Sequence, residues 1–148
     1  TSQMDVVKEL SEVLEVFGSR SERESIALEI NIPKNGIIIY GDKNRLKQSF
    51  VNIIDNSFKY NKKGGTVKVS LKADSKNVII IISDNGCGIS KNDLPRVREK
   101  FYKANNSVRG SGIGLAVTDE IIKLHNGSLQ IDSELDKGTT VRVSLPRR

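Results

Sequence analysis

Residues 42–60 read Asp-Lys-Asn-Arg-Leu-Lys-Gln-Ser-Phe-Val-Asn-Ile-Ile-Asp-Asn-Ser-Phe-Lys-Tyr, with no glycine or proline among them. Asp42 is suited to cap the start of a helix, so this stretch predicts a helix of about five turns. When the residues are placed at about 100° intervals, one side of the helix is apolar. That side carries Leu46, Phe50, Ile53, Ile54 and Phe58.

The opposite side of this predicted helix is polar and carries Arg45, Gln48, Asn52, Asn56 and Lys59. Asparagine is a poor helix former, so two of them four residues apart are an unusual choice for a surface that only faces water. Two interpretations are open at this point. The two asparagines are an ordinary polar face, or their carboxamides meet a ligand or a metal.

The composition is that of one globular domain, residues 1–148, with 36% hydrophobic and 28% charged residues. The chain starts with Thr1, and we expect it to be a fragment of a longer protein. No apolar run approaches the roughly 20 residues of a membrane span. The single Cys87 excludes an internal disulfide and a cysteine-based zinc site, and it fits a reducing compartment. We therefore expect a cytoplasmic domain, whether or not the full-length protein is anchored to a membrane.

The net charge of +6 comes from 24 basic and 18 acidic residues. The basic residues are scattered and accompany no nucleic-acid-binding signature, so we expect no nucleic-acid partner. An anionic small ligand or an acidic protein partner fits this charge at least as well.

Hydrophobic patterns place the other elements of the first half. An amphipathic helix is predicted over residues 6–17, ended by Gly18 and followed by a loop over 19–25. Strands are predicted over 26–32, 37–40 and 67–71, and a hairpin connection over 74–76. Residues 78–82 are apolar without alternation, which predicts a central strand buried on both faces.

In the second half, short helical turns are predicted over residues 91–101, a polar loop over 102–111, and a helix over 112–125 closed by Asn126 and Gly127. Two strands follow around 129–131 and 141–145, joined by a turn at 136–138. About three helices and six or seven strands, partly in hairpins, predict an α/β two-layer sandwich with a mixed sheet.

Two glycine-containing segments are candidates for ligand contact. Residues 84–88 read Asp-Asn-Gly-Cys-Gly and directly follow the predicted buried strand, where ligand crevices commonly form. The carboxylate of Asp84 can accept a hydrogen bond from an exocyclic amine, and Gly86 and Gly88 allow close backbone approach. An ordinary Asp-Gly turn explains the same residues about as well.

The second segment, residues 110–114, reads Gly-Ser-Gly-Ile-Gly and precedes a predicted helix. Glycines at a helix start expose backbone N–H groups and the positive end of the helix dipole to an anion, typically a phosphate. The spacing matches neither a Walker A loop nor a dinucleotide fingerprint, so this segment alone is a weak signal.

The combination is more specific than its parts. In order, it comprises the Asn-rich helix, the Asp-x-Gly-x-Gly turn, Phe-Tyr-Lys at 101–103, the glycine-rich loop and Gly-Thr-Thr at 138–140. This order resembles the ATP-binding catalytic domain of sensor histidine kinases, which belongs to the Bergerat-fold ATPases. Residues 41–48 and Lys-Leu-His-Asn-Gly at 123–127 resemble the kinase branch, and the resemblance covers essentially the whole chain.

The resemblance implies a role for each matching residue. Asn56 would bind Mg²⁺, Asn52, Lys59 and Lys103 would contact phosphates, and Tyr60 and Tyr102 would flank the nucleotide. Asp84 would accept the adenine amine, and Phe101 would anchor a lid over residues 103–111. Asn56, Lys59 and Lys103 would be the catalytic residues. The implied ATP-binding set is Asn52, Asn56, Lys59, Tyr60, Asp84, Gly86, Gly88, Ile89, Tyr102, Lys103, Gly110, Gly112, Gly114, Leu115 and Thr140.

Three features depart from the family pattern. Residues 98–101 keep only the second of two usual lid-anchoring phenylalanines, because Arg98 stands at the position of the first. Lys103 stands where the family often has an arginine, and a lysine lacks the bidentate fork of a guanidinium. The implied lid is also short.

The resemblance implies transfer of the γ-phosphoryl group of ATP to a histidine on a separate helical hairpin, with a response regulator downstream in two-component signalling. The only histidine, His125, lies at a predicted helix end and is interpreted as structural, so the phosphoacceptor hairpin lies outside this chain. We expect the isolated domain to be monomeric.

Asp55 is either a general base or, as we favour, a solvated acid. An anti-sigma-factor-type serine kinase and a nucleotide-binding module without turnover stay open as alternatives.

Overall fold

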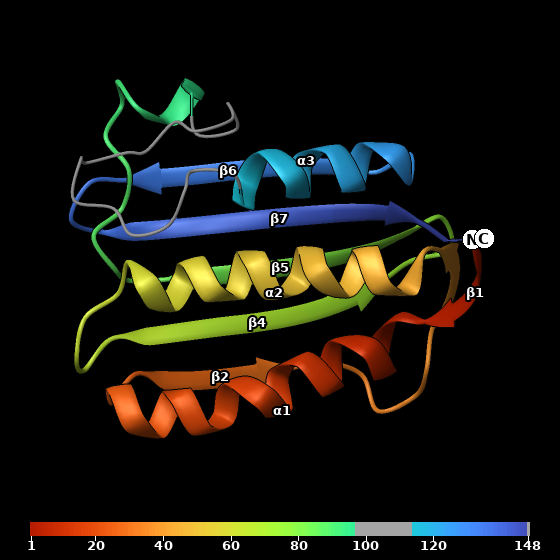
Figure 1. The fold of residues 1–148 in the computed structure, drawn as a ribbon, viewed down its shortest axis with the longest axis horizontal. Coiled ribbons are helices and arrows are strands. Elements are labelled where there is room, and N and C mark those ends of the chain that lie inside the picture. Colours follow the sequence, from red (N-terminus) through yellow and green to blue (C-terminus); the bar gives the residue numbers. More distant parts are fainter. Residues whose placement is uncertain (97–113, 148) are drawn as a thin grey trace.

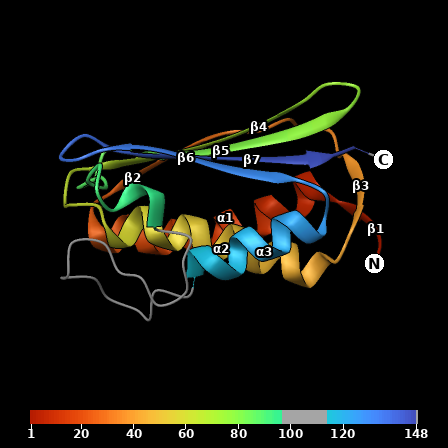
Figure 2. The ribbon, with the colours of Figure 1, turned by 90° about the horizontal axis from the view of Figure 1, so that it is seen from above.

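The chain folds into two layers, a sheet and a set of helices that cover one of its faces (Figures 1 and 2). The computed structural model describes residues 1–96 and 114–147. Within these residues the helical layer contains α1 (Val6–Glu24), α2 (Lys43–Lys59) and α3 (Gly114–Leu124), with a short 3-10 helix at Leu94–Arg96. The predicted α/β two-layer sandwich is therefore confirmed.

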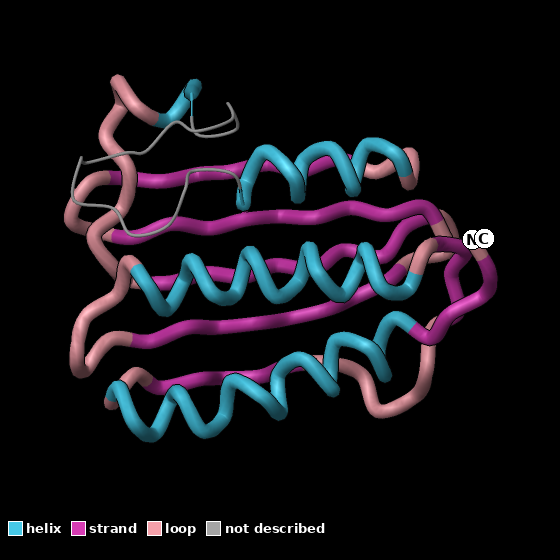
Figure 3. Tube along the Cα trace, in the orientation of Figure 1, coloured by secondary structure: helices cyan, strands magenta, loops and turns pink. Residues whose placement is uncertain are grey.

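The main sheet has five strands in the order β2-β4-β5-β7-β6 (Figure 3). Their bounds are Ala27–Asn31 for β2, Thr66–Ala73 for β4, Asn77–Asp84 for β5, Ser128–Glu134 for β6 and Gly138–Pro146 for β7. β2 runs parallel to β4 and the other neighbours are antiparallel, so the sheet is mixed as predicted. A separate two-stranded sheet joins β1 (Ser2–Asp5) to β3 (Ile38–Gly41).

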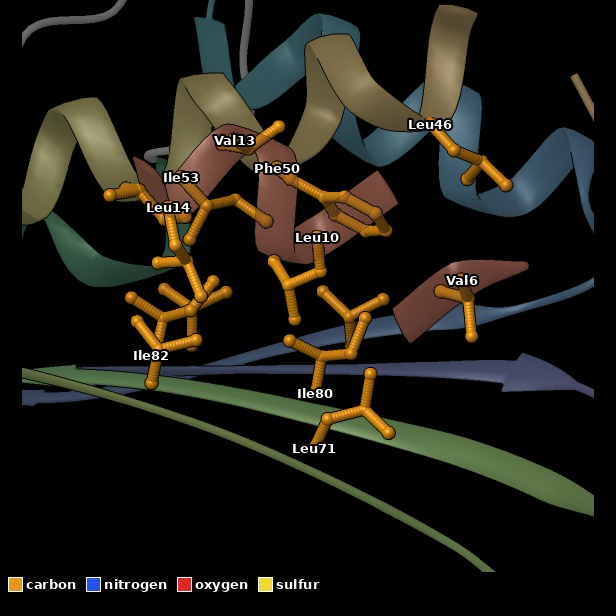
Figure 4. Packing of buried hydrophobic residues seen from close by; sticks show 14 of the residues in the cluster. Val6, Leu10, Val13, Leu14, Leu46, Phe50, Ile53, Leu71, Ile80 and Ile82 are labelled. Atoms are coloured by element: carbon orange, nitrogen blue, oxygen red, sulfur yellow. The ribbon is translucent and has the colours of Figure 1, made fainter. Parts of the chain in front are cut away.

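Helix α2 lies at the middle of the helical layer, and its apolar side forms the centre of the core. Asp42 caps its start by accepting a hydrogen bond from the backbone N–H of Arg45, as predicted. All five residues of the predicted apolar side are at most 2% exposed. In Figure 4, Phe50 and Ile53 point toward side chains of α1 and toward Ile80 and Ile82 of the sheet. The pattern of residues 42–60 thus predicted how this helix packs.

The prediction that Gly18 ends the first helix is wrong. Helix α1 continues to Glu24 and ends at Ser25, whose φ of 54° is left-handed. No atom lies within 4 Å of the Cβ that a side chain at Gly18 would add, so this glycine meets no packing constraint. Glycine costs a helix roughly 0.5–1 kcal/mol, which contacts made by the next turn can offset. That turn contains Arg20, which binds α2.

The prediction that residues 78–82 are buried on both faces is also wrong. Val78, Ile80 and Ile82 face the helices and are at most 1% exposed, whereas Ile79 and Ile81 alternate with them and are half-buried. β5 is the central strand, as predicted, but helices cover only one face of the sheet (Figure 2). On the open face, neighbouring strands cover Ile79 and Ile81 in part, so a continuous run of isoleucines does not require helices on both faces of the sheet.

Most other predicted elements agree with the structure. The hairpin at 74–76 joins β4 to β5, and the turn at 136–138 joins β6 to β7 with positive φ at Asp136 and Gly138. Asn126, with φ of 62°, ends the α3 segment as predicted. Strand β1 was not predicted because four residues carry too little pattern. Within the described residues, no helix is both long and apolar enough to cross a membrane.

Candidate nucleotide-binding site

The polar side of α2 faces α3 and the ion pairs of α1 along its C-terminal half. The side-chain amide of Asn52 donates to the hydroxyl of Thr118 at 3.4 Å. Thr118 lies on α3 and is fully buried. This contact was not predicted, although a threonine within the apolar stripe of a helix is itself a signal of a buried polar contact.

One turn further along α2, Asn56 is half-buried. Within the described residues, no protein group is hydrogen-bonded to its carboxamide. Its neighbour Asp55 is held by two cations, with Oδ1 2.5 Å from Arg20 Nη1 and Oδ2 3.2 Å from Lys59 Nζ. Asp55 is therefore a partly exposed acid whose two oxygens both serve ion pairs, rather than a merely solvated one, and these pairs argue against a general base.

The loop over residues 84–88 is clamped on both sides by backbone contacts. The carbonyl of Tyr60, at the end of α2, accepts a hydrogen bond from the N–H of Cys87 at 2.9 Å. An added Cβ at Gly86 would overlap that same carbonyl oxygen. On the other side, the carbonyl of Cys87 accepts from the N–H of Asp136 at 2.7 Å.

Gly88 is constrained in a similar way, because its φ is 70° and an added Cβ would overlap the carbonyl of Glu134. Both glycines are therefore required by contact between protein segments. The sequence predicts a different reason for Gly86 and Gly88, which is close approach of the backbone to a ligand. Their place in the base pocket stays a prediction.

Asp84 ends β5 and is half-buried. Burial raises the pKa of its carboxyl to about 6, against the opposing effects of backbone N–H groups of Gly86 and Thr139 and of the charge of Lys62. The Gly86 N–H donates to Oδ1 at 2.9 Å. At neutral pH most of this carboxyl is ionised, so it can accept a hydrogen bond from an amine.

Three further predicted residues lie on elements that adjoin this loop or α2. Thr140 is paired with Ser83 across the β5–β7 ladder, with their hydroxyl oxygens 3.0 Å apart. The backbone N–H of Ile89 donates to Ser133 Oγ at 2.8 Å, a contact that the sequence did not indicate. Leu115 is half-buried in the first turn of α3.

The structure thus gathers part of the predicted set. The C-terminal half of α2 carries Asn52, Asn56 and Lys59. Tyr60 directly follows the helix, and the Asp84 loop contacts it there. Gly114 opens α3. The remaining predicted nucleotide contacts lie outside the described residues, and they are Tyr102, Lys103, Gly110 and Gly112. Phe101 and the implied lid at 103–111 lie outside them too.

The donor set fits a metal shared with a ligand better than a metal held by protein alone. In residues 1–96 and 114–147, no three His, Cys, Asp or Glu side chains gather into a metal-binding group. Mg²⁺ usually keeps several waters and takes one or two protein oxygens plus substrate phosphates. The carboxamide of Asn56 offers one such hard oxygen.

His125 lies at the other end of α2. Its Nε2 accepts a hydrogen bond from the backbone N–H of Asp42 at 2.9 Å. Its Nδ1 lies 2.8 Å from the carbonyl of Ile121, so the N–H on that nitrogen donates. These contacts tie the end of α3 to the start of α2, and they support a structural role for this histidine.

The fold defines an α/β two-layer domain, and comparison with known proteins gives its family. Residues 41–148 match the family described as histidine kinase-, DNA gyrase B- and HSP90-like ATPase. The chain belongs to this family of ATPases.

Its relatives include kinases that are named for sporulation. Sporulation kinase A of Bacillus subtilis is 33% identical over 145 residues, which cover 98% of this chain and 24% of that protein. Sporulation kinase C of the same organism is 35% identical over 143 residues, 93% of this chain and 33% of that protein. The chain thus spans a third or less of these two relatives.

Solved structures agree. The mycobacterial sensor histidine kinase MprB has a TM-score of 0.87 and 28% identity, over 99% of both chains. The resemblance to the ATP-binding catalytic domain of sensor histidine kinases is therefore confirmed.

Proposed function

We propose that this chain is the catalytic domain of a histidine kinase. It binds ATP with Mg²⁺, and it transfers the γ-phosphoryl group to a histidine on a helical hairpin of the same, longer protein. The observation that carries the proposal is the meeting of two features. The half-buried, ionised Asp84 at the end of β5 lies on the loop that contacts the end of α2, the helix bearing Asn52, Asn56 and Lys59.

Each group has a distinct role in this proposal. Asp84 accepts the hydrogen bond of the adenine amine, and Tyr60 and Ile89 adjoin the base. Asn56 holds Mg²⁺ through its carboxamide oxygen, and Asn52 and Lys59 contact phosphate oxygens. Mg²⁺, when bound, neutralises charge on the phosphates. The remaining proposed nucleotide contacts are Gly86, Gly88, Tyr102, Lys103, Gly110, Gly112, Gly114, Leu115 and Thr140.

Phosphoryl transfer depends on positioning and charge neutralisation more than on covalent chemistry by the protein. Lys59 and Lys103 supply positive charge toward the phosphates in this proposal, and α2 supplies a rigid wall because its apolar side is packed into the core. The accepting imidazole belongs to the hairpin, since the one histidine of this chain is engaged between α2 and α3. A response regulator receives the phosphoryl group downstream.

The experiment has a binding arm and a transfer arm. In the first, the chain is titrated with a fluorescent ATP analogue with and without Mg²⁺, and we expect binding that Mg²⁺ strengthens. Absence of binding at millimolar nucleotide would reject the proposal. In the second, the full-length protein is incubated with radiolabelled ATP, and the stability of the label is measured.

A label that is lost in acid and kept in alkali identifies a phosphohistidine, as we expect. The reverse stability identifies a phosphoserine and would favour the serine-kinase alternative. ATP binding with no label at all would favour a binding module without turnover.

A further inference from the structure

The ion pair between Arg20 and Asp55 reaches the proposed phosphate-binding end of α2, and neither residue is among the proposed nucleotide contacts. Arg20 lies in the part of α1 beyond Gly18, which runs beside α2 (Figure 1). Its guanidinium binds two carboxylates, Glu24 at 2.7 Å through Nε and Asp55 at 2.5 Å through Nη1. One arginine therefore links the last turns of both helices.

The position of this guanidinium is fixed by more than its charges. It lies over the rings of Phe17 and Phe58, 5.9 Å and 5.4 Å from their centroids, and these two rings stack on each other. The Arg20 side chain is 21% exposed. A guanidinium held by two rings and two carboxylates is not expected to follow a ligand, whereas a lysine ammonium on its flexible stem can.

Asp55 is the residue through which Arg20 can act on the site. Its second oxygen binds Lys59, one turn further along α2, at 3.2 Å. Asp55 is 31% exposed and Lys59 is 25% exposed, so their attraction is only partly screened by water. Any phosphate that Lys59 binds must compete with Asp55 for the ammonium group.

We propose that Arg20 is a positioning residue for nucleotide binding: by sharing Asp55 with Lys59, it weakens the hold of Asp55 on Lys59 and leaves that ammonium able to contact phosphate. This inference rests on the proposed function. A positioning role predicts weaker binding of the phosphates alone, whereas a merely structural role predicts weaker binding of the whole nucleotide. The adenine part is read by Asp84 on another element.

The chain contains a matched control at the opposite end of the same helix pair. Lys47 of α2 binds Glu9 at 3.3 Å and Glu12 at 3.0 Å, both on α1. The Lys47–Glu12 and Arg20–Asp55 contacts each join residues 35 positions apart, so both bridge α1 and α2. Lys47 lies in the N-terminal half of α2, away from Asn56 and Lys59.

The experiment measures the dissociation constants of Mg-ATP and of adenosine for the wild type, Arg20→Met and Lys47→Met. For Arg20→Met we expect affinity for Mg-ATP to fall about fivefold, the size of one partly exposed ion pair, with adenosine affinity within about twofold of wild type. Lys47→Met should leave both affinities unchanged. An equal loss for ATP and adenosine, or the same loss in Lys47→Met, would overturn the proposal.

Two further variants complete the test. In an Asp55→Asn background, Arg20→Met should no longer change ATP affinity, because the residue it acts through is gone; an undiminished effect would overturn the proposal. Arg20→Lys keeps the charge without the fork, and it serves if Arg20→Met does not fold. This variant should lower the affinity for Mg-ATP by about twofold and leave the affinity for adenosine unchanged. A wild type that binds neither ligand would reject the proposed function itself, and the positioning role with it.

Discussion

The two ends of helix α2 differ in how completely protein contacts account for their polar groups. At the start, Asp42 caps the helix, its own backbone N–H binds His125, and Lys47 binds two glutamates of α1. At the other end, Asn56 is half-buried, and no group in the described parts of the chain binds its side chain. The sequence of α2 is polar at both ends, but the half-buried polar side chains at its start, Asp42 and Lys47, are bound by the protein itself.

The loops next to these two ends differ in the opposite sense, because the loop at the end of α2 has the tighter backbone contacts. Gly41 precedes the start of α2 and packs against side chains of His125 and Leu46. Gly86 meets the end of α2 through the backbone of Tyr60 and Asn61. An added Cβ would lie 2.9 Å from these side chains at Gly41 but would lie much closer to the Tyr60 carbonyl oxygen at Gly86, and that carbonyl cannot move without moving the end of the helix. The end that we propose to bind nucleotide is therefore also the more rigidly built one, as a preorganised site requires.

Of the changes that distinguish the two ends of α2, Asp84→Asn should have the largest effect on nucleotide affinity. An amide in place of the carboxylate turns one acceptor oxygen into a donor and removes the charge, so we expect affinity for ATP and for adenosine to fall about 100-fold. Calorimetric titration of both ligands measures this.

The control is the same chemical change at the other end, Asp42→Asn. Asparagine caps a helix as well as aspartate does, so nucleotide affinity should be unchanged. If Asp84→Asn binds within about twofold of wild type, Asp84 does not read the adenine.

A second comparison uses Gly86→Ala and Gly41→Ala. The new methyl group at Gly86 would overlap the Tyr60 carbonyl, so we expect a loss of about 2–3 kcal/mol in the free energy of unfolding. The Cβ added at Gly41 would lie 2.9 Å from Cδ2 of His125 and from Cδ1 of Leu46, a milder overlap than the one with the Tyr60 carbonyl at Gly86. A loss of about 1 kcal/mol is expected there.

Urea unfolding of both variants measures the difference. Equal losses would show that the loop over residues 84–88 is not held more rigidly than the start of α2.

The sequence predicted what depends on local pattern. The capped helix with its apolar stripe, the two hairpin turns and the positions of most strands along the chain follow from periodicity and turn residues, and the structure confirms them. Asn52, Asn56 and Asp84 also had unusual local contexts, since asparagine disfavours a helix and an aspartate ends the central strand. These residues could be selected before any fold was known.

What the sequence did not predict depends on contacts between distant segments. Arg20 is unremarkable beside Gly18 until α2 supplies Asp55 and Phe58, 35 or more residues away. Thr118 and Ser133 bind partners on other elements in the same way. The half-burial of Ile79 and Ile81 depends on the number of layers, which no single strand encodes.

The third prediction has the smallest effect and concerns pH. Because the pKa of Asp84 is raised to about 6, the carboxylate that would accept the adenine amine becomes protonated below this pH. We expect affinity for adenosine to fall up to about tenfold between pH 7 and pH 5. Adenosine is the better probe than ATP here, because it carries no phosphate that titrates in this range.

Stability of the chain without nucleotide should change in the opposite direction over part of this range. A carboxyl whose pKa is raised in the folded state binds more protons when folded, so this group contributes stability at low pH that is lost as pH rises through about 6. Asp84→Asn should remove both pH dependences, while Asp42→Asn should keep them. Persistence of the adenosine dependence in Asp84→Asn would assign it to another group and would place the titrating residue outside the Asp84 loop.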